Sequence, residues 1–391
     1  MAVSPYGFYR GTNHLFWRDF EWDWRMSFFG NHRTRTWVNG DCHAYNYGAF
    51  HEHTIGVVFG LNDFDESLIA DYQYDLWRLA VSLVLIAREN NFFKRRQQER
   101  ILAALGEAYL GAMARFAGGQ EPGGIYFNAR QTHGPLQKFL NKIEAKQDRE
   151  WMLTKWTESD GRFNFALEKL DPVADDVREQ LLAGIERYVE TLDGDVEFGE
   201  GFFKVKDVAR RVNAGTGSLG VRRYYVLLEG CPHTPRHNVI LDVKQQLGPT
   251  GFAYATAARR HAYDEQFANE GARYCAAYRA LSYHPDDLLG WFEWDQISFG
   301  VRELNPWKAS FPTRKLRSAQ RFASLADQWG EILATAHARG SHASDYDLPA
   351  EVTALTSTRR DAFDHTVIDV ATGYADVVEA DWRIFCKVAG S

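Results

Sequence analysis

The spacing of apolar residues divides the chain into a helical region, a strand-rich region and a second helical region. Between residues 75 and 117, apolar positions recur at the three- and four-residue intervals of two amphipathic helices. Residues 134–198 repeat this helical spacing, most clearly in DDVREQLLAGIERYVETL. The glycine-rich stretch AGGQEPGG at 117–124 breaks the pattern between them.

After residue 200 the pattern changes to apolar runs rich in Val, Ile, Tyr and Leu, with Gly and Pro between the runs. Such runs are typical of strands. We expect strands in VARRVNAGTGSLGVRRYYVLLEG, in HNVILDVKQQ and in QISFGVREL at 296–304. A helical stretch at about 256–281 precedes the last of these strands.

The chain is helical again from about residue 314 to 338, and Gly340 is a suitable C-terminal stop. One stripe of this helix is apolar: Phe322, Leu325, Trp329, Leu333 and Ala336. The whole pattern predicts an α+β protein in which a small sheet lobe packs against a larger helical lobe. Its segments would be residues 1–200 (helical), 201–309 (β-rich) and 310–391 (helices returning to the helical lobe).

Composition and charge exclude several classes of protein. The 391 residues carry a formal net charge of −7, which argues against a nucleic-acid backbone as the main partner. The longest apolar run, LAVSLVLIA at 79–87, is too short for a membrane span, and the N-terminus has no signal-peptide pattern. The four cysteines lie far apart, as in a reducing compartment. We therefore expect a soluble, cytoplasmic protein with no nucleic-acid or membrane partner.

A glycine-rich segment lies between two strand-like runs and consists of Gly215, Thr216, Gly217, Ser218, Leu219 and Gly220. In dinucleotide-binding folds a helix follows this glycine spacing directly. Here the strand-like run VRRYYVLLEG follows, which favours the glycine hairpin that covers ATP phosphates in protein kinases. Glycines let backbone N–H groups approach phosphates closely. A flexible hairpin turn without a ligand is the alternative.

The next strand-like run contains a candidate phosphate-binding lysine. A kinase-type glycine loop is followed by a strand whose lysine contacts the α- and β-phosphates. Lys244, at the end of the alternating run NVILDVK, has this place in the sequence. A lysine at a strand end is otherwise usually solvated, so this assignment depends on the glycine loop that precedes it.

The segment GDCHAYN contains Asp41 and Asn46, which have the spacing of the base and a Mg²⁺-binding Asn in the kinase catalytic loop. Asp63 in LNDFDE follows an apolar run and takes the place of the second Mg²⁺ ligand, with Asp65 as possible support. Hard oxygen ligands hold Mg²⁺ against the phosphates, while a separate carboxylate accepts the proton of the incoming hydroxyl. We therefore predict that Asp41 is catalytic and that Asn46 and Asp63 bind the metal.

A transition-metal site is a second interpretation of the same region. His43, His51 and His53 could bind Zn or Fe together with an Asp, because imidazoles favour these metals. His51 and His53 lie on a strand-like run and could share a face. This arrangement would indicate a metallohydrolase or an oxygenase, whereas histidines on a solvated hairpin would have no such role.

These motifs resemble segments of known enzymes. GDCHAYNYG is similar to the G-D-x-H-x-x-N loop of aminoglycoside and choline phosphotransferases, and NDFDE is similar to their I-D-F/W-D/E segment. Asp75 in YDLWRLA resembles the aspartate at the helix start that supports the catalytic loop in those enzymes.

From residue 4 to 340 the chain resembles a bacterial family known only as domain of unknown function 2252. The matching segments, in family order, are SPYGFYRG, GDCHAYNYGAF, NDFDES, YDLWRLAVS, DVARRVNAGTGSLGVRRYYVLLEG, VILDVKQQ, DDLLGW, VRELNPWK and LATAHARG. In GARYCAAYR, however, Ala276 stands where the family has an acid. This departure leaves Glu265 or Glu270 as the candidate partner of Lys244.

The order of the motifs differs from that of kinases, in which the glycine loop and the lysine precede the catalytic loop. Here Asp41 precedes Gly215. Circular permutation of the kinase-like two-lobed fold accounts for this order, because permutation requires only that the old termini be close and exposed. ILATAHARG, near the C-terminus, would then be the helix that normally leads into the catalytic loop.

The resemblance implies a permuted kinase-like phosphotransferase that uses ATP and Mg²⁺ to phosphorylate a hydroxyl. By analogy with the related enzymes, the acceptor would be a small molecule. Lys244 and the Gly215–Gly220 loop would hold the phosphates, and the adenine would lie against FGVREL near residues 302–305. Two alternatives stay open: a nucleotide-binding pseudokinase that regulates a partner, and an enzyme of the same fold that transfers AMP.

Overall fold

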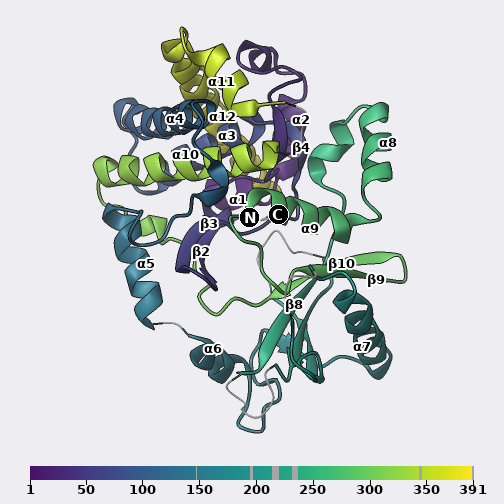
Figure 1. The fold of residues 1–391 in the computed structure, drawn as a ribbon. Coiled ribbons are helices and arrows are strands. Elements are labelled where there is room, and N and C mark those ends of the chain that lie inside the picture. Colours follow the sequence, from purple (N-terminus) through teal and green to yellow (C-terminus); the bar gives the residue numbers. More distant parts are fainter. Residues whose placement is uncertain (147, 194–196, 214–219, 231–236, 343–345, 390–391) are drawn as a thin grey trace.

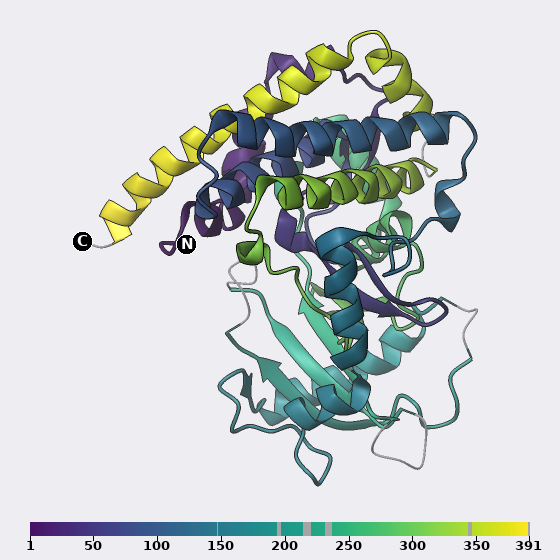
Figure 2. The ribbon, with the colours of Figure 1, turned by 90° about the vertical axis from the view of Figure 1, so that its left-hand side faces the viewer.

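The structure is a computed structural model that describes residues 1–146, 148–193, 197–213, 220–230, 237–342 and 346–389. A larger helical part lies beside a smaller part built on a β-sheet, and both ends of the chain lie on the helical part (Figures 1 and 2). The α+β class predicted from the sequence is confirmed.

The helical part forms because long amphipathic helices bury their apolar stripes against one another. Helix α10 (Ala319–Ser341) packs along α4 (Arg95–Ala117), which is the most extensive helix pair of the described chain. The other helices of this part are α1 (Pro5–Arg10), α2 (Asn13–Phe20), α3 (Gln73–Glu89), α5 (Gly134–Lys146), α11 (Leu348–Thr356) and α12 (Arg360–Ala389).

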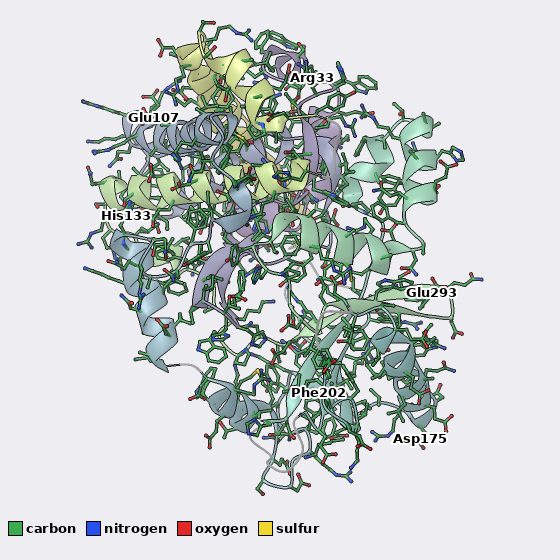
Figure 3. The ribbon with its side chains drawn as sticks, viewed as in Figure 1. Arg33, Glu107, His133, Asp175, Phe202 and Glu293 are labelled. Atoms are coloured by element: carbon green, nitrogen blue, oxygen red, sulfur yellow. The ribbon has the colours of Figure 1, made fainter. Side chains whose placement is uncertain are left out.

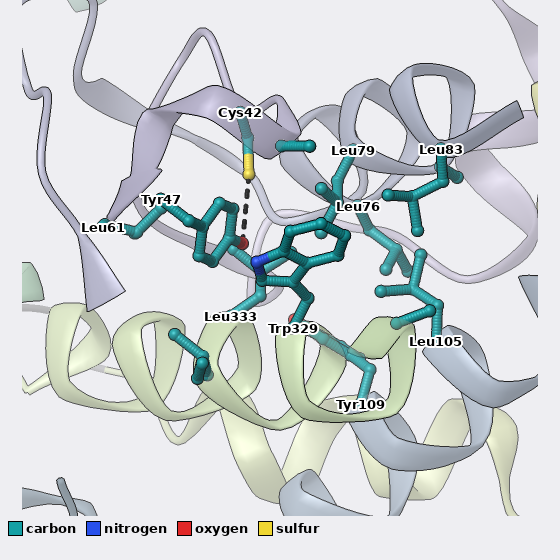
Figure 4. Close-up of a cluster of buried hydrophobic side chains, with 14 of the residues drawn as sticks. Cys42, Tyr47, Leu61, Leu76, Leu79, Leu83, Leu105, Tyr109, Trp329 and Leu333 are labelled. Atoms are coloured by element: carbon teal, nitrogen blue, oxygen red, sulfur yellow. Dashed lines mark hydrogen bonds between the residues drawn. The ribbon is translucent and has the colours of Figure 1, made fainter. Parts of the chain in front are cut away.

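The predicted apolar stripe of α10 is confirmed, because all of its members are buried: Phe322, Leu325, Trp329, Leu333 and Ala336. Trp329 gathers with Tyr47, Leu76 and Leu105 in one cluster of the main core (Figure 4). Burial of one such large apolar side chain contributes about 2–3 kcal/mol. The helix ends one residue beyond the predicted stop at Gly340.

The sheet part is a six-stranded antiparallel sheet with the order β5-β6-β7-β8-β10-β9. Its strands are β5 (Leu170–Asp171), β6 (Val205–Arg211), β7 (Arg223–Leu228), β8 (Val239–Gln245), β9 (Gly290–Trp294) and β10 (Ile297–Glu303). Helix α7 (Asp175–Val189) covers the face that contains Val243, and α6 (Arg149–Trp156) covers part of the other face. Because side chains alternate along a strand, Asp242 and Lys244 of β8 lie on the face away from α7.

Two smaller antiparallel ribbons position the polar segments of the N-terminal region: β1 (Arg35–Val38) with β4 (Leu68–Asp71), and β2 (Tyr47–Glu52) with β3 (Gly56–Leu61). Residues 39–46, here called the Asp41 loop, join β1 to β2. Residues 62–67, here called the Asp63 loop, join β3 to β4. The remaining helical segments are α8 (Ala257–Gln266), α9 (Glu270–Leu281) and the 3-10 turns Trp24–Phe28, Ala44–Asn46, Pro122–Gly124, Thr250–Tyr254 and Thr313–Lys315.

Most of the expected elements are present at the expected places. Helices α3 and α4 match the two helices predicted at 75–117, and the predicted strands after residue 200 are present as β6, β7, β8 and β10. The region 134–198 is divided between the two parts of the molecule. Helix α5 lies on the helical part, whereas α6 and α7 pack against the sheet. The part of the chain that packs with the sheet therefore begins before residue 200, where the segment boundary was expected.

A buried carboxylate, Asp75, connects three segments that are distant in the sequence. It lies in the first turn of α3 and is 1% exposed. Its oxygens accept hydrogen bonds from the backbone N–H groups of Asn39 (2.5 Å) and Gly40 (2.9 Å). His337 of α10 also contacts it, with 3.1 Å between Nε2 and Oδ2, and the other ring nitrogen of His337 lies 2.9 Å from the hydroxyl of Tyr109. Asp75 therefore joins α3, the Asp41 loop and α10.

Replacement of this carboxylate by a methyl group should destabilise the protein strongly. Asp75→Ala would leave two backbone N–H groups and a histidine buried without their acceptor. We expect the free energy of unfolding to fall by about 3 kcal/mol in denaturant titrations. Asp369→Ala, which removes an exposed partner of Arg95, is the control and should change stability by less than about 0.5 kcal/mol. Similar losses in the two variants would contradict this role of Asp75.

Candidate active site

The backbone of the Asp41 loop is held in one conformation by a close approach to the Asp63 loop. Gly40 has a φ of 78°, and a Cβ at this position would lie 1.9 Å from the carbonyl oxygen of Glu66, so glycine is required. Its own carbonyl oxygen accepts hydrogen bonds from Trp17 (2.9 Å) and Asn13 (3.1 Å). The following residue, Asp41, is therefore presented from a rigid backbone.

The carboxylate of Asp41 is paired with a buried arginine of α3. Nε of Arg78 donates to Oδ1 of Asp41 at 2.6 Å, and the guanidinium lies 4.4 Å from the centre of the Tyr9 ring. Burial raises the pKa of Asp41 to about 7, although Arg78 favours the charged form. A carboxyl group with this pKa exchanges protons near neutral pH, as a general base must.

Asn46 and Asp63 line the same cavity as Asp41. The side-chain amide of Asn46 donates to the backbone carbonyl of Asp41 (2.8 Å), and the backbone N–H of Asn62 donates to the carbonyl of Asn46 (3.0 Å). Burial disfavours the charge of Asp63, but the surrounding cations Lys244, Arg302, Lys308 and Arg223 together outweigh it and hold the pKa of Asp63 well below its usual range. Asp63 is therefore a carboxylate at all physiological pH values.

Lys244 forms an ion pair with Asp65, whose other oxygen accepts a hydrogen bond from Gln246 (3.1 Å). The expectation that Glu265 or Glu270 pairs with this lysine is wrong. Glu270 binds Arg273 instead (2.7 Å), and Glu265 lies on the surface beside His261. The acid that holds Lys244 thus comes from the Asp63 loop and not from the helices after β8.

The structure brings the candidate residues of both halves of the chain to one cavity of about 490 Å³. Asp41, Asn46 and Asp63 line it from the helical part, and Lys244 lines it from the sheet. The ribbon leaves an apparent gap between the two parts, but side chains from both sides extend into it (Figure 3). The cavity is the part of this space that stays open.

The structure describes only one end of the predicted glycine loop. Gly215, Thr216, Gly217 and Ser218 lie outside the described residues. The strands that flank them, β6 and β7, pair in antiparallel fashion, as the hairpin prediction requires. Gly220 directly precedes the chain that leads into β7 and has a φ of 79°.

The three histidines considered for a transition-metal site do not form one group: His51 and His53 lie edge to face, with 5.9 Å between ring centres, but His43 is apart from them. His43 lines the cavity beside Asp41, whereas His51 stacks on Trp307 with 4.3 Å between ring centres. His53 lies on the surface, 3.6 Å from a carboxylate oxygen of Asp287. Within the described ranges, no group of three or more His, Cys, Asp or Glu side chains could hold a metal ion.

The sequence analysis did not single out several cations of this cavity region, among them Arg78, Arg302 and Lys308. Arg78 follows Asp75 by three positions on a predicted helix, and this spacing places both on one face. This spacing was the available signal. Arg302 alternates with the buried Val301 on β10, but an arginine in such a strand is usually solvated. Arg302 and Lys308 both lie in VRELNPWK, a segment that resembles the family, but the resemblance gives neither residue a role.

Comparisons with known proteins give a family but no characterised relative. No curated protein and no solved structure matches the chain. None of the helices in the described parts of the chain has the length and apolar character needed to cross a membrane. One family model, described as "Uncharacterized protein conserved in bacteria (DUF2252)", matches residues 1–388. The chain therefore belongs to this uncharacterised bacterial family, DUF2252.

Proposed function

We propose that this cavity is the active site of an ATP- and Mg²⁺-dependent phosphotransferase that moves a phosphorus-containing group to a hydroxyl of a small molecule. The observation that carries the proposal is the convergence of Asp41, Asn46, Asp63 and Lys244 on one cavity. These residues are separated by up to about two hundred positions in the sequence. A general base, two oxygen ligands and a phosphate-binding cation are the groups that this chemistry requires.

Asp41 would act as the general base. Its pKa of about 7 lets it accept the proton of an attacking hydroxyl near neutral pH and release it afterwards. Arg78 fixes the orientation of the carboxylate through Oδ1. The second oxygen, Oδ2, lies 3.6 Å from Nε2 of His43 and is the one available to an acceptor.

Asn46 and Asp63 fit a magnesium ion. Both line the same cavity, both present hard oxygens, and the Asp63 carboxylate stays ionised. The amide of Asn46 uses its nitrogen for the Asp41 carbonyl, which turns its oxygen away from that contact. A magnesium ion held there would neutralise phosphate charge as the bond at phosphorus breaks. Lys244, held ready by Asp65, would bind a phosphate oxygen.

The arrangement of the elements supports a permuted kinase-like fold. The candidate phosphate-binding lysine is on the third strand counted from the glycine hairpin, β6, β7 and then β8, as it is in protein kinases. Helix α10 ends beside β1, because the hydroxyl of Thr36 donates to the carbonyl of His337 (2.8 Å). This contact brings the end of α10 to the start of the Asp41 loop, where the unpermuted chain would be continuous.

Two alternatives to transfer of the terminal phosphate use the same cavity. A pseudokinase would bind the nucleotide without turnover, and an AMP-transferring enzyme would need the same base, metal ligands and lysine. Because the required residue types are all present, a catalytic role is favoured over a purely regulatory one. The acceptor and the compartment remain expectations from the sequence: a small molecule, in the cytoplasm.

Removal of the base tests the proposed activity. We expect Asp41→Asn to lower Mg²⁺-dependent ATP turnover by ~10²–10⁴-fold, with water or an added alcohol as acceptor. ATP affinity measured by calorimetry should change little, since Asp41 binds no phosphate. Equal turnover in wild type and Asp41→Asn would refute the proposal. ATP binding without turnover in the wild type would favour the pseudokinase.

The pH dependence of turnover should follow the ionisation of Asp41. The base form is the carboxylate, so turnover should fall as the pH drops through about 7. Arg78→Met removes a charge that lowers the pKa of Asp41, so the midpoint should move to higher pH. Arg88→Met, which loses surface partners at the far end of the same helix, is the control. An unmoved midpoint in Arg78→Met would contradict Asp41 as the titrating base.

The metal site can be tested without measuring turnover. Asp63→Asn keeps the shape of the side chain but removes the charge that a divalent cation needs. We expect the affinity for Mn²⁺, measured by titration calorimetry in the presence of an ATP analogue, to fall about tenfold or more. Asp287→Asn, at a half-exposed carboxylate outside the cavity, should bind as the wild type does. An unchanged affinity in Asp63→Asn would exclude Asp63 as a ligand.

A further inference from the structure

One end of the cavity, here called the strand-side end, is lined by charged side chains: Arg223, Asp242, Arg302 and Lys308. Strand register explains this clustering. Arg302 of β10 lies opposite Asp242 of β8, and Arg223 of β7 lies opposite Lys244. All of these strand residues belong to one face of the sheet. The Asp242–Arg302 row is two residues along the strand from Lys244, which is about 7 Å.

Two acids near this end are already used by other cations. Asp242 binds Arg223 through both of its oxygens, at 2.6 and 2.5 Å. Asp65 is paired with Lys244. These carboxylates therefore form their hydrogen bonds with other cations, and Asp242 and Asp63 act on Arg302 and Lys308 only through space.

Arg302 and Lys308 have no carboxylate partner in the described ranges of the chain. The guanidinium of Arg302 donates to the backbone carbonyl of Asn62 (3.0 Å), a neutral acceptor. The positive charge of Arg302 lowers the pKa of Lys308. The strand-side end thus has a positive potential, and a divalent cation bound at Asp63 would increase it.

A nucleobase would be poorly accommodated at this end. A base-binding slot needs apolar walls and free backbone groups. The backbone N–H of Glu303 already donates to Asp286 (2.6 Å), and that of Leu304 donates to the carbonyl of Ile240 (2.8 Å). The position expected for adenine, near residues 302–305, therefore presents charged side chains and occupied backbone donors.

Hydrogen bonds give the order of groups along the cavity. Arg302 donates to the carbonyl of Asn62, which directly precedes Asp63, and the N–H of Asn62 donates to the carbonyl of Asn46 (3.0 Å). The side-chain amide of Asn46 donates in turn to the carbonyl of Asp41 (2.8 Å). The Asp63 loop therefore lies between Arg302 and the Asp41 loop.

We propose that ATP binds with its β- and γ-phosphates at Arg302 and Lys308 and its base toward Arg10 and His14, so that the α-phosphorus faces Asp41. The inference rests on the proposed function and specifies which phosphorus atom is attacked. Guanidinium and ammonium groups without carboxylate partners match the charge of two terminal phosphates. Arg10 lies on the Asp41 side of the cavity, because it donates to His43 (3.4 Å), which is 3.6 Å from Asp41, and it already lies over the ring of Tyr45. The planar groups of Arg10 and of the exposed His14 can stack on any base.

The reaction that follows is AMP transfer. The acceptor hydroxyl oxygen forms a bond to the α-phosphorus while the bond from that phosphorus to the α,β-bridging oxygen breaks. The hydroxyl proton passes to Asp41. Pyrophosphate leaves with the electron pair of the broken bond, and Arg302 and Lys308 stabilise its charge.

Displacement of a ribose-labelled fluorescent ATP tests the orientation without any turnover. With Mg²⁺ present, we expect inorganic tripolyphosphate to compete within about tenfold of ATP, and GTP and CTP to compete as ATP does. Adenosine should be weaker by about a hundredfold or more. Adenosine competing as well as ATP, with tripolyphosphate inactive, would overturn the proposed orientation.

Substitutions of Arg302 and Lys308 test whether these two cations bind the phosphates. Lys308→Ala should weaken tripolyphosphate binding about tenfold and leave adenosine unaffected. Arg302→Ala should do the same, and Lys308, an exposed side chain, keeps the test valid if the variant at the half-buried Arg302 fails to fold. Lys142→Ala, on the exposed surface of α5, is the control and should bind as the wild type does. Unchanged tripolyphosphate affinity in Lys308→Ala and in a folded Arg302→Ala would overturn the inference.

The products of ATP labelled at the α-phosphorus, with water as acceptor, give an independent answer. AMP and pyrophosphate support the inference. ADP and phosphate overturn it but leave the proposed phosphotransferase intact. Failure to bind MgATP in calorimetry would overturn both proposals, and if turnover with water is absent, the displacement results decide the orientation.

Discussion

The geometry of the candidate site depends on a single buried carboxylate, Asp75. It accepts hydrogen bonds from two consecutive backbone amides, Asn39 and Gly40, immediately before Asp41. Arg78, one helical turn later on α3, binds the Asp41 side chain. One face of one helix therefore fixes both the backbone and the carboxylate of the proposed base. A displacement of α3 would move both together.

Two cations of the sheet, Arg223 and Lys244, are held in a different manner, each in a pair with a carboxylate. Arg223 with Asp242 and Lys244 with Asp65 each satisfy one another at the cavity wall. Desolvating such pairs costs free energy, which good geometry only partly offsets. What they provide is order, because long cationic side chains held in one rotamer lose little entropy when an anion binds.

Motif spacing in the sequence was sufficient to select Asp41, Asn46, Asp63 and Lys244, because each lies in a short segment whose neighbours define its place on a loop or strand. The apolar stripe of α10 was predictable for a similar reason, since it follows a regular period. The partner of Lys244 was not predictable. Asp65 is 179 positions away, and only the packing of the Asp63 loop against β8 brings the two together.

The cations of the strand-side end were hidden for a related reason. Arg302 belongs to an alternating strand, and its neighbours Asp242 and Arg223 are on strands whose register cannot be read from their own sequences. A single shift of β10 against β8 would place Arg302 on the opposite face, among the apolar residues under α7. The charge of the cavity is thus a property of strand pairing and not of any one motif.

In the proposed permuted fold, the chain is cut between α10 and the Asp41 loop, so a peptide connection is replaced by packing. The substitutes are the contacts of His337 with Asp75 and Thr36, and the approach of Gly340 to β1, where a Cβ would lie 3.0 Å from atoms of Thr36 and Trp37. All of these contacts are buried, so their strength does not depend on where the chain begins and ends. A loop whose position is set by such contacts does not need covalent continuity with the preceding helix. Asp75 contacts both the backbone amides of the Asp41 loop and His337 of α10. These contacts allow the proposed fold to keep its geometry without a peptide connection between the two segments.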